Sequence, residues 1–327
     1  MSKLATVFGG SGFLGRYIVR RLAKAGWRVR VAVRNPNDAG FVRPYGVVGQ
    51  VEPVFCNIRD DASVRAVMKD ADAVVNCVGI LAESGKQSFD TVQAEAPERI
   101  ARVAAEEGVD RMVHISAIGA DRDSASDYAR TKAIGEEGVL RHMPQAMILR
   151  PSIVFGQEDA FFNRFARMVR FSPFLPLVGP DTKFQPVYVD DVAAAAMKGI
   201  AGQAEPGIYE LGGPDVNTFR GLMKQMLKVI YRRRIVLGLP FWLGSVMGRA
   251  FDLLNTISLG LISGPITLDQ VRNLRQDNVV HEGAKTFADL GIEPTSLEAV
   301  LPEYLWPYRP SGQYAEMKAS AKRLNGT

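Results

Sequence analysis

The chain has 327 residues, a formal net charge of +5 and a hydrophobic fraction of 47%, values typical of a soluble protein with one large or two unequal domains. This modest charge does not indicate nucleic-acid binding, and no known nucleic-acid-binding module is present. Two cysteines and three scattered histidines exclude a disulfide framework and predict no metal site. No apolar run is long enough to span a bilayer, and we expect no targeting segment before the first predicted strand.

The first predicted strand, Leu4–Phe8, leads into a glycine-rich turn that precedes a predicted helix at Tyr17–Ala23. Gly9, Gly12 and Gly15 follow one another at three-residue spacing. In a dinucleotide site the first glycine permits a tight turn, the second lets the backbone approach a pyrophosphate, and the third lets the helix pack on the strand. The helix N-terminus offers unpaired N–H groups and a positive dipole to the phosphates. The sequence therefore predicts a dinucleotide site here.

Strands and helices alternate through the rest of the first half. Further strands are predicted at Val29–Val33, Val51–Phe55, Ala73–Val78, Met112–Ser116 and Ala146–Leu149, and helices at Ala62–Lys69, Phe89–Glu107 and Asp127–Arg141. This alternation predicts an α/β fold with a doubly wound parallel Rossmann sheet. We expect a dinucleotide-binding domain over residues 1–150, with sheet elements continuing to about residue 215. Residues 151–327 are expected to form a smaller, mostly helical lobe.

The residue at the end of the second strand distinguishes the two nicotinamide nucleotides. NAD sites place Asp or Glu there for the ribose 2′-hydroxyl, whereas NADP sites use Arg for the 2′-phosphate. This chain has Arg34 at that position, and Arg16, directly after Gly15, is a second cation that can reach the same phosphate. A pair of solvated surface arginines is the alternative interpretation. The pattern favours NADP(H) over NAD(H).

Two further segments follow strands, at the edge where open α/β sheets bind ligands. Asn57 and Ile58 follow the third strand and are expected beside the adenine. Val78 and Gly79 end the fourth strand and are expected to let the backbone approach the second phosphate and ribose.

Tyr128 and Lys132 lie four residues apart, so a helix places both side chains on one face. An ammonium close to a phenol lowers the phenol's pKa, which would let Tyr128 act as a general acid in hydride transfer to a carbonyl. Lys132 would also bind the nicotinamide ribose, and Ser116 could polarise the carbonyl. The same spacing also arises often by chance.

The chain resembles the short-chain dehydrogenase/reductase superfamily, in its extended and atypical branch. The motifs that carry the resemblance cover residues 1 to about 215: Gly9-x-x-Gly12-x-x-Gly15, Asn76-x-x-Gly79, Ser116, Tyr128-x-x-x-Lys132, Leu149–Gly156 and Pro186–Ala193. The resemblance implies that Pro151 and Ile153 contact the nicotinamide end. The expected dinucleotide contacts are then Gly9, Gly12, Phe13, Leu14, Gly15, Arg16, Arg34, Asn57, Ile58, Val78, Gly79, Ser116, Tyr128, Lys132, Pro151 and Ile153.

Within this superfamily the chain is similar to the NADPH-binding accessory subunits of respiratory complex I. The similar stretches are Gly9–Arg16, Val33–Pro36, Tyr128–Lys132 with Gly135-Glu136, Pro151–Asp159 and Phe161–Arg164. That resemblance implies a bound NADPH that is structural and is not turned over. Only about a dozen positions separate Ser116 from Tyr128, where active extended members usually have a longer insertion. We therefore expect no catalytic residue, with Ser116, Tyr128 and Lys132 as vestigial candidates.

The second half offers a docking surface. Residues 216–251 contain no acidic residue, and Arg220, Lys224, Lys228 and Arg232 recur every four residues, which predicts a basic stripe on one helix face. Leu222, Met223, Met226, Leu227 and Ile230 lie off the stripe, where they can pack. Arg233 and Arg234 extend it, and apolar runs follow at Ile235–Leu243, Leu253-Leu254 and Ile257–Ile262. Basic and apolar side chains together suit anionic lipid headgroups, contacted through Arg232, Arg233 and Arg234. The alternative is an ordinary solvated helix beside a small apolar core.

The resemblance implies other complex I subunits as partners, near the junction of the peripheral and membrane arms. The expected location is the cytoplasmic face of a bacterial inner membrane, or the matrix face of the inner mitochondrial membrane for an organellar chain. Residues 315–327 are expected to be a short tail or an arm that orders on a partner. The alternative function is an active NADP-dependent oxidoreductase or epimerase that uses Tyr128 and Lys132. Redox sensing through transcription-factor binding has no specific support in the sequence.

Overall fold

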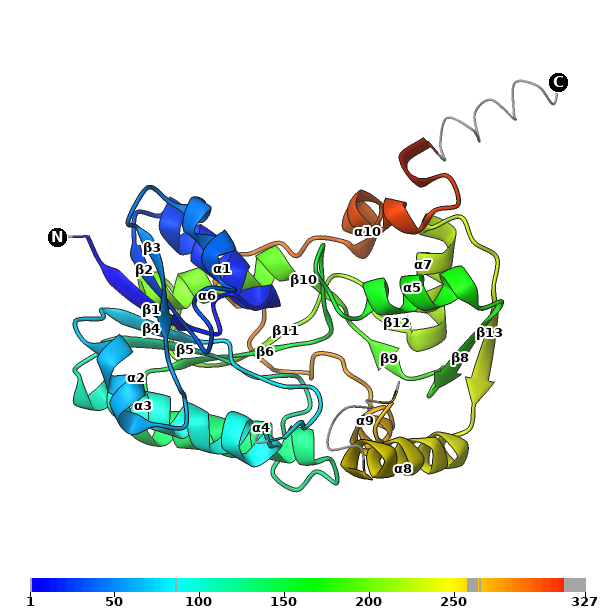
Figure 1. The fold of residues 1–327 in the computed structure, drawn as a ribbon, viewed down its shortest axis with the longest axis horizontal. Helices are drawn as coiled ribbons and strands as arrows, with labels where there is room; N and C mark the ends of the chain where they lie inside the picture. Colours follow the sequence, from blue (N-terminus) through cyan, green and yellow to red (C-terminus); the bar gives the residue numbers. More distant parts are fainter. Residues whose placement is uncertain (1, 86, 258–263, 265, 315–327) are drawn as a thin grey trace.

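A seven-stranded parallel sheet forms the larger lobe of the computed structural model, which describes residues 2–85, 87–257, 264 and 266–314 (Figure 1). The strand order is β11-β6-β5-β4-β1-β2-β3, and it reverses at the β1–β4 pair, where open sheets bind ligands. This confirms the predicted doubly wound parallel sheet. The strands are β1 (Leu4–Phe8), β2 (Arg28–Val33), β3 (Val51–Phe55), β4 (Ala73–Asn76), β5 (Arg111–Ile115), β6 (Met147–Pro151) and β11 (Gly207–Leu211).

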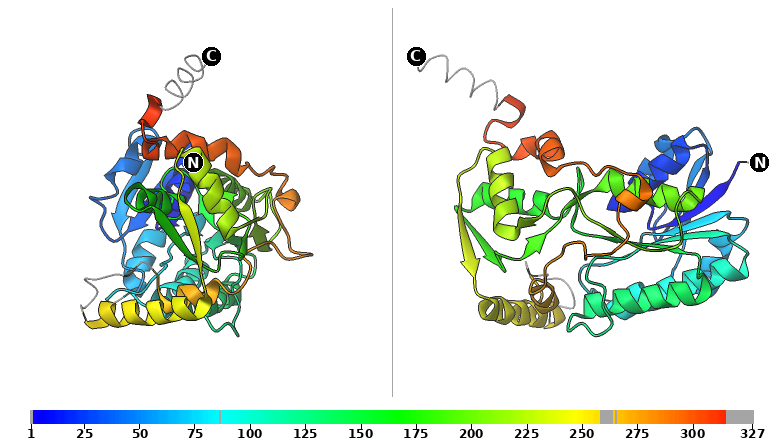
Figure 2. Two further views of the ribbon diagram at one scale, coloured as in Figure 1. Left: turned by 90° about the vertical axis from the view of Figure 1, so that its right-hand side faces the viewer. Right: turned by 180° about the vertical axis from the view of Figure 1, so that it is seen from behind.

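Helices cover both faces of the sheet (Figures 1 and 2). The helices are α1 (Phe13–Lys24) and α6 (Val189–Ala201) on one face, and α2 (Asp61–Met68), α3 (Ala96–Glu106) and α4 (Asp127–His142) on the other. Because side chains alternate along a strand, β1 contributes to the core on each face of the sheet. Ala5 and Val7 pack toward α1 and α6, whereas Phe8 packs toward α2, α3 and α4.

Some predicted boundaries differ from the structure. The helix predicted from Tyr17 begins at Phe13, directly on the glycine turn, and the one predicted over Phe89–Glu107 starts with a π-helical turn before α3. The strand predicted to reach Val78 ends at Asn76. Asn76 Oδ1 accepts a hydrogen bond from Val78 N at 3.1 Å, which replaces the strand's ladder bonding.

In the described residues, the smaller lobe combines helices with three two-stranded sheets that the sequence did not predict. Its core is rich in phenylalanine, including Phe184 and Phe219 with ring centroids 5.7 Å apart. The helices are α5 (Phe162–Phe171), α7 (Phe219–Val229), α8 (Phe241–Ile257), α9 (Leu268–Asn273) and α10 (Leu297–Leu305). The strand pairs are β7 (Val154–Phe155) with β10 (Val187–Tyr188), β9 (Lys183–Phe184) with β12 (Asn217–Thr218), and β8 (Phe174–Val178) with β13 (Ile235–Leu239).

The chain crosses between the two lobes more than once. After the first part of the small lobe, α6 and β11 return to the sheet. After α9, the chain runs back to the sheet again (Figure 1). There Asn278 O accepts from Ser152 Oγ at 3.0 Å, and Lys285 O accepts from Glu210 N at 2.8 Å. Later segments therefore reach the carboxyl edge of the sheet. Within the part of the chain described, no helix has the length and apolar character needed to cross a membrane.

The predicted basic stripe is wrong in its last member. Helix α7 ends at Val229 because Tyr231 adopts φ +54° and Arg232 N donates to Leu227 O at 3.0 Å, a left-handed helix ending. Arg232 therefore lies beyond the helix. The apolar side chains of α7 and its end are buried as predicted: Leu222, Met223, Met226, Leu227 and Ile230. The predicted apolar run beyond Ile257, and the tail at 315–327, lie outside the described residues.

Candidate dinucleotide site

The glycine turn has the geometry that a pyrophosphate site requires. Gly9 adopts φ +72°, and its carbonyl accepts from Gly12 N at 2.9 Å. A Cβ on Gly15 would lie 2.7 Å from Gly10 Cα, so a side chain there would push α1 away from the turn. Gly12 precedes α1 and no side chain caps the helix, which leaves the first N–H groups available to a phosphate. Phe13 and Leu14 are half-buried in this first turn.

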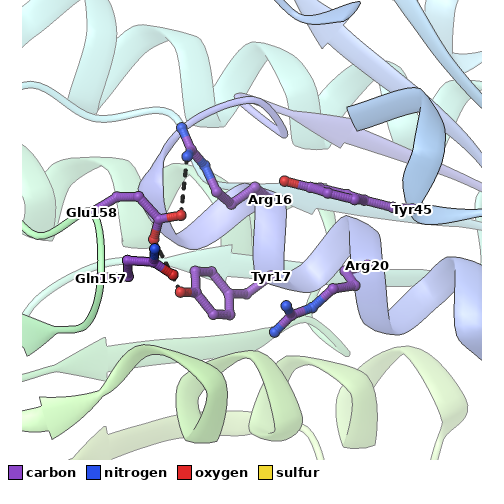
Figure 3. A pocket seen from close by; sticks show the side chains of 6 residues that line it. All are labelled: Arg16, Tyr17, Arg20, Tyr45, Gln157 and Glu158. Carbon is purple, nitrogen blue, oxygen red and sulfur yellow. Dashed lines mark hydrogen bonds and ion pairs between the residues drawn. The ribbon is translucent and has the colours of Figure 1, made fainter. Parts of the chain in front are cut away.

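The two predicted phosphate ligands differ in their surroundings. Arg34 follows β2, is exposed and has no ion pair or hydrogen bond in the described part of the chain. Arg16 instead donates to Glu158 Oε1 at 3.3 Å (Figure 3). It also donates to Ser11 O at 3.2 Å. Glu158 also accepts from Tyr17 Oη at 3.0 Å. Arg16 is thus oriented by its neighbours, whereas Arg34 is free to bind an anion.

Arg16 and Glu158 line a small polar cavity of about 50 Å³ together with Tyr17, Arg20, Tyr45 and Gln157. Figure 3 shows these six side chains. Arg16 lies with its guanidinium 4.8 Å from the centre of the Phe41 ring. The cavity is too small for a nucleotide and marks the outer rim of the glycine turn.

Further predicted residues lie where the parallel strands end. Asn57 is exposed after β3, with its Oδ1 accepting from Arg59 N at 3.2 Å, and Ile58 is half-buried beside it. Val78 and Gly79 follow β4, and a Cβ on Gly79 would lie 3.4 Å from Lys132 Nζ. Because β1, β3 and β4 are parallel, the turn and these segments share one edge of the sheet.

The residues expected at the nicotinamide end are mostly buried. Lys132 donates from Nζ to Ile115 O at 3.1 Å. Ser116 is 4% exposed, and its Oγ has no hydrogen-bond partner within the described residues. Since an unpaired buried hydroxyl costs about 1 to 3 kcal/mol, a polar group of a bound nucleotide would relieve that cost. Pro151 is buried at the end of β6, and Ile153 is half-buried beyond it. The residues present therefore fit a dinucleotide.

The predicted lowering of the Tyr128 pKa by Lys132 is wrong. Burial, and then the carboxylate of Asp269, raise the pKa of Tyr128 to about 12. Burial lowers the pKa of Lys132 to about 8, and its ammonium group bonds the Ile115 carbonyl. Helical spacing placed both residues on one side of α4, but the small lobe supplies the charge that acts on the phenol. These surroundings do not favour proton transfer by Tyr128.

A buried polar pair underlies this end of the sheet. Asn76 Nδ2 donates to His114 Nδ1 at 3.2 Å, and both side chains are buried. Burial, and then the charge of Lys132, lower the pKa of His114 to about 3. Cys56 and Cys77 are free thiols, and burial raises their pKa values to about 11 and about 12. No group of side chains within the described ranges could hold a metal ion.

Two residues at the site had no role assigned from the sequence. Glu158 contacts Arg16 across 142 positions, and Asp269 contacts Asp127 across 142 positions. Glu158 lies in one of the stretches on which the family resemblance rests, but the sequence does not indicate that Arg16 is its partner. Asp269 had no signal at all, because only the fold brings α9 to the start of α4.

Comparison with known proteins places this chain in a family. The model of the NAD dependent epimerase/dehydratase family matches residues 5–212. The chain is 39% identical over 316 residues to NADH dehydrogenase [ubiquinone] 1 alpha subcomplex subunit 9 of Arabidopsis thaliana, covering 94% of this chain and 79% of the relative. It is 33% identical to the subunit of the same name from Mus musculus, covering 94% and 80%.

A solved structure with the same fold is an NADPH-dependent quinone oxidoreductase from Escherichia coli, complexed with NADPH. It has a TM-score of 0.69 and 17% identity, covering 92% of this chain and 98% of that one. At this identity the likeness concerns the fold alone. The chain has an NAD(P)-binding fold and belongs to the NAD dependent epimerase/dehydratase family, within the branch formed by the NADH dehydrogenase [ubiquinone] 1 alpha subcomplex subunit 9 proteins.

Proposed function

We propose that this chain is an accessory subunit of the proton-pumping NADH:quinone oxidoreductase and carries NADPH as a structural cofactor. One observation carries the proposal: similarity to the subunit 9 proteins spans 94% of the chain and so includes the small lobe beyond residue 212. A shared dinucleotide-binding fold would explain similarity over the sheet alone. Similarity in the small lobe supports a shared assembly role.

The arginines support NADPH as the nucleotide. Among the described residues Arg34 has no ion pair or hydrogen bond, and it lies at the end of β2, the position that meets the adenosine ribose in this fold. A guanidinium there can form charge-assisted bonds to a 2′-phosphate, and no acidic side chain directly follows β2 to favour a 2′-hydroxyl. Arg16, held by Ser11 O and Glu158, adds positive charge at the start of α1.

The surroundings of Tyr128 support a structural role for the cofactor. A phenol with a pKa near 12 is a weak proton donor at neutral pH, and Lys132 is turned toward a backbone carbonyl. The alternative, an active oxidoreductase or epimerase, needs Tyr128 to exchange a proton with a substrate. The short segment between Ser116 and Tyr128 also leaves little chain to form a substrate pocket.

The small lobe carries a basic–apolar patch, by which we mean Arg170, Phe171, Phe174, Arg233, Ile235 and Leu237. Phe174 on β8 pairs with Ile235 on β13, and both side chains are exposed, whereas Leu175 is buried. Phe171, in the same patch, is 84% exposed. We propose that this patch contacts anionic lipid headgroups beside the partner subunits, on the cytoplasmic face of a bacterial inner membrane or the matrix face of its mitochondrial counterpart.

The three arginines predicted for this contact are not equivalent. Arg232 donates from Nε to Tyr308 O at 2.9 Å, and Arg234 donates from Nε to Val169 O at 2.9 Å, so both also hold the lobe together. Burial, and then the charges of Arg234 and Arg170, lower the pKa of Arg232. Arg233 is exposed, which makes it the better lipid contact. An anionic surface would relieve the repulsion among these cations.

The assembly proposal is tested by gentle solubilisation of native membranes, affinity capture of this chain, and identification of co-purifying proteins and bound nucleotide. We expect other subunits of the quinone oxidoreductase, and NADPH in preference to NADH. Capture of the chain alone, without these subunits, would contradict the proposal. Oxidation of NADPH with a small carbonyl compound at ordinary enzyme rates, abolished by Tyr128→Phe, would establish the alternative.

The lipid contact is tested with Arg170→Glu/Arg233→Glu on vesicles of phosphatidylcholine with and without phosphatidylglycerol. Each cation near an anionic surface contributes about 1 kcal/mol, so the double reversal should weaken binding to the anionic vesicles by about tenfold or more. Arg28→Glu/Lys69→Glu, on exposed positions of the sheet lobe, makes the same change in net charge and serves as the control. Equal loss in both variants would contradict a specific patch.

A further inference from the structure

Helix α9 of the small lobe caps the helix that carries Tyr128 and Lys132. Asp269 Oδ1 accepts from Asp127 N at 2.7 Å, and its Oδ2 accepts from Tyr128 N at 3.2 Å and from Ser126 Oγ at 2.8 Å. These backbone groups belong to the first turn of α4, whose N–H groups have no partner within the helix. A carboxylate there is also stabilised by the helix dipole. The start of α4 is thus fixed by a residue 141 positions away from Tyr128.

Two more side chains of α9 bond the loops around the same place. Gln270 Nε2 donates to Leu81 O at 3.3 Å, in the segment that follows Gly79, and Arg272 Nη1 donates to Ala125 O at 3.2 Å, just before α4. Helix α9 therefore bridges the loop after β4 and the start of α4. Those are the two elements that meet where Gly79 approaches Lys132.

Helix α9, which carries Asp269, is itself held firmly in place. Thr267 and Gln270 form a capping box at the start of α9. Leu268 N donates to Asp252 Oδ2 of α8 at 3.0 Å, and a Cβ on Gly248 would lie 2.7 Å from Leu268 N, so the two helices pack closely. A side chain held from a rigid support can fix another group in place.

We propose that Asp269 is a positioning residue for the nicotinamide half of the bound dinucleotide. By binding the amide of Tyr128 and its neighbours, the Asp269 carboxylate determines where the first turn of α4 places Tyr128 and Lys132 against the cofactor. Asp269 itself touches no part of the glycine turn. The inference rests on the proposed function, because it takes the dinucleotide as the ligand of this edge of the sheet.

The test compares Asp269→Asn with the unchanged full-length chain for binding of NADPH and of 2′,5′-ADP, by titration calorimetry. The second ligand contains only the adenine half. Because the substitution removes the negative charge from the hydrogen bonds that fix the first turn of α4, NADPH should bind about tenfold more weakly. Affinity for 2′,5′-ADP should stay within about twofold, since Asp269 acts on the other half. Asp277→Asn is the matched control, because Asp277 accepts from Lys183 N at 2.8 Å in the same lobe.

Amide hydrogen exchange at Asp127 and Tyr128 provides a second readout, and Asp269→Glu a second variant. Exchange at these amides should rise in Asp269→Asn, and the longer carboxylate should restore most of the NADPH affinity. Equal loss of both ligands, or loss of neither, would overturn the positioning role while leaving the proposed cofactor in place. An unchanged chain that binds neither ligand would overturn the proposed function together with this inference.

Discussion

The two ends of the proposed dinucleotide site are built in different ways. The adenine end consists of the glycine turn, Arg34 and the loop after β3, all within the first 60 residues and close to their neighbours in sequence. The nicotinamide end joins Gly79, Ser116, Tyr128 and Lys132 and depends on Asp269 from the small lobe. One end is a local motif, and the other exists only because the chain returns to the sheet.

The difference extends to charge. Arg34, at the proposed adenine end, is exposed and open to an anion that arrives from solvent. At the nicotinamide end the ionisable groups Lys132 and His114 are buried, and burial lowers the pKa of each. The first arrangement suits recognition of an anion, and the second suits holding a ring and a ribose away from water.

Gly15→Ala should have the largest effect on NADPH binding, because it changes the glycine turn itself. The new Cβ would lie 2.7 Å from Gly10 Cα and would force α1 off the turn. We expect loss of measurable NADPH binding and a fall of about 1 to 3 kcal/mol in the free energy of unfolding. Gly40→Ala, where a Cβ meets nothing within 4 Å, is the control in denaturant titration and binding assays. Normal NADPH binding by Gly15→Ala would mean that the turn does not carry the site.

Arg34→Ala should have the next largest effect on NADPH binding. Loss of a charge-assisted contact of about 1.5 to 3 kcal/mol should weaken NADPH binding about ten- to a hundredfold and leave NADH binding nearly unchanged. Arg28→Ala, at the other end of β2, controls for the loss of a positive charge. Equal losses for the two nucleotides would reject Arg34 as the 2′-phosphate ligand.

His114→Gln tests the buried end through pH. The folded pKa of His114 is about 3, below the ordinary value of 6.5, so the unfolded chain takes up a proton that the folded chain refuses. The free energy of unfolding therefore falls as pH drops from 6.5 toward 3, by about 2 kcal/mol near pH 5. The variant should lack this part of the acid dependence in urea titrations. Parallel pH profiles for the two proteins would argue against a buried neutral histidine.

Glu158→Gln should have the smallest effect. It tests whether the adenine end depends on Glu158, a residue from a later segment of the chain. Its ion pair with Arg16 at 3.3 Å is partly exposed, and pairs of that kind contribute about 1 kcal/mol or less. Arg16 keeps its bond to Ser11 O, so NADPH affinity should stay within about fivefold. A larger change in the dissociation constant would show that the later segment helps to build this end as well.

The sequence was most informative where the chemistry lies in consecutive residues. Spacing of Gly9, Gly12 and Gly15 identified the turn, and alternation of apolar strands with helices identified the parallel sheet. It was least informative in the small lobe, where short strands such as β9 and β12 have no length over which a period can be read. Arg232 was misplaced because a regular four-residue spacing continued past the point where Tyr231 ends α7.

By itself, then, the sequence determined the strand–turn–helix unit, the doubly wound sheet and the position of Arg34, because each follows from backbone geometry and periodicity over a few neighbouring residues. Only the tertiary structure decided the pKa of Tyr128 and the orientation of the Arg16 side chain. Their surroundings come from Asp269 and Glu158, more than 140 positions away, and an electrostatic environment depends on distance in space, on burial and on partners that spacing along the chain does not reveal.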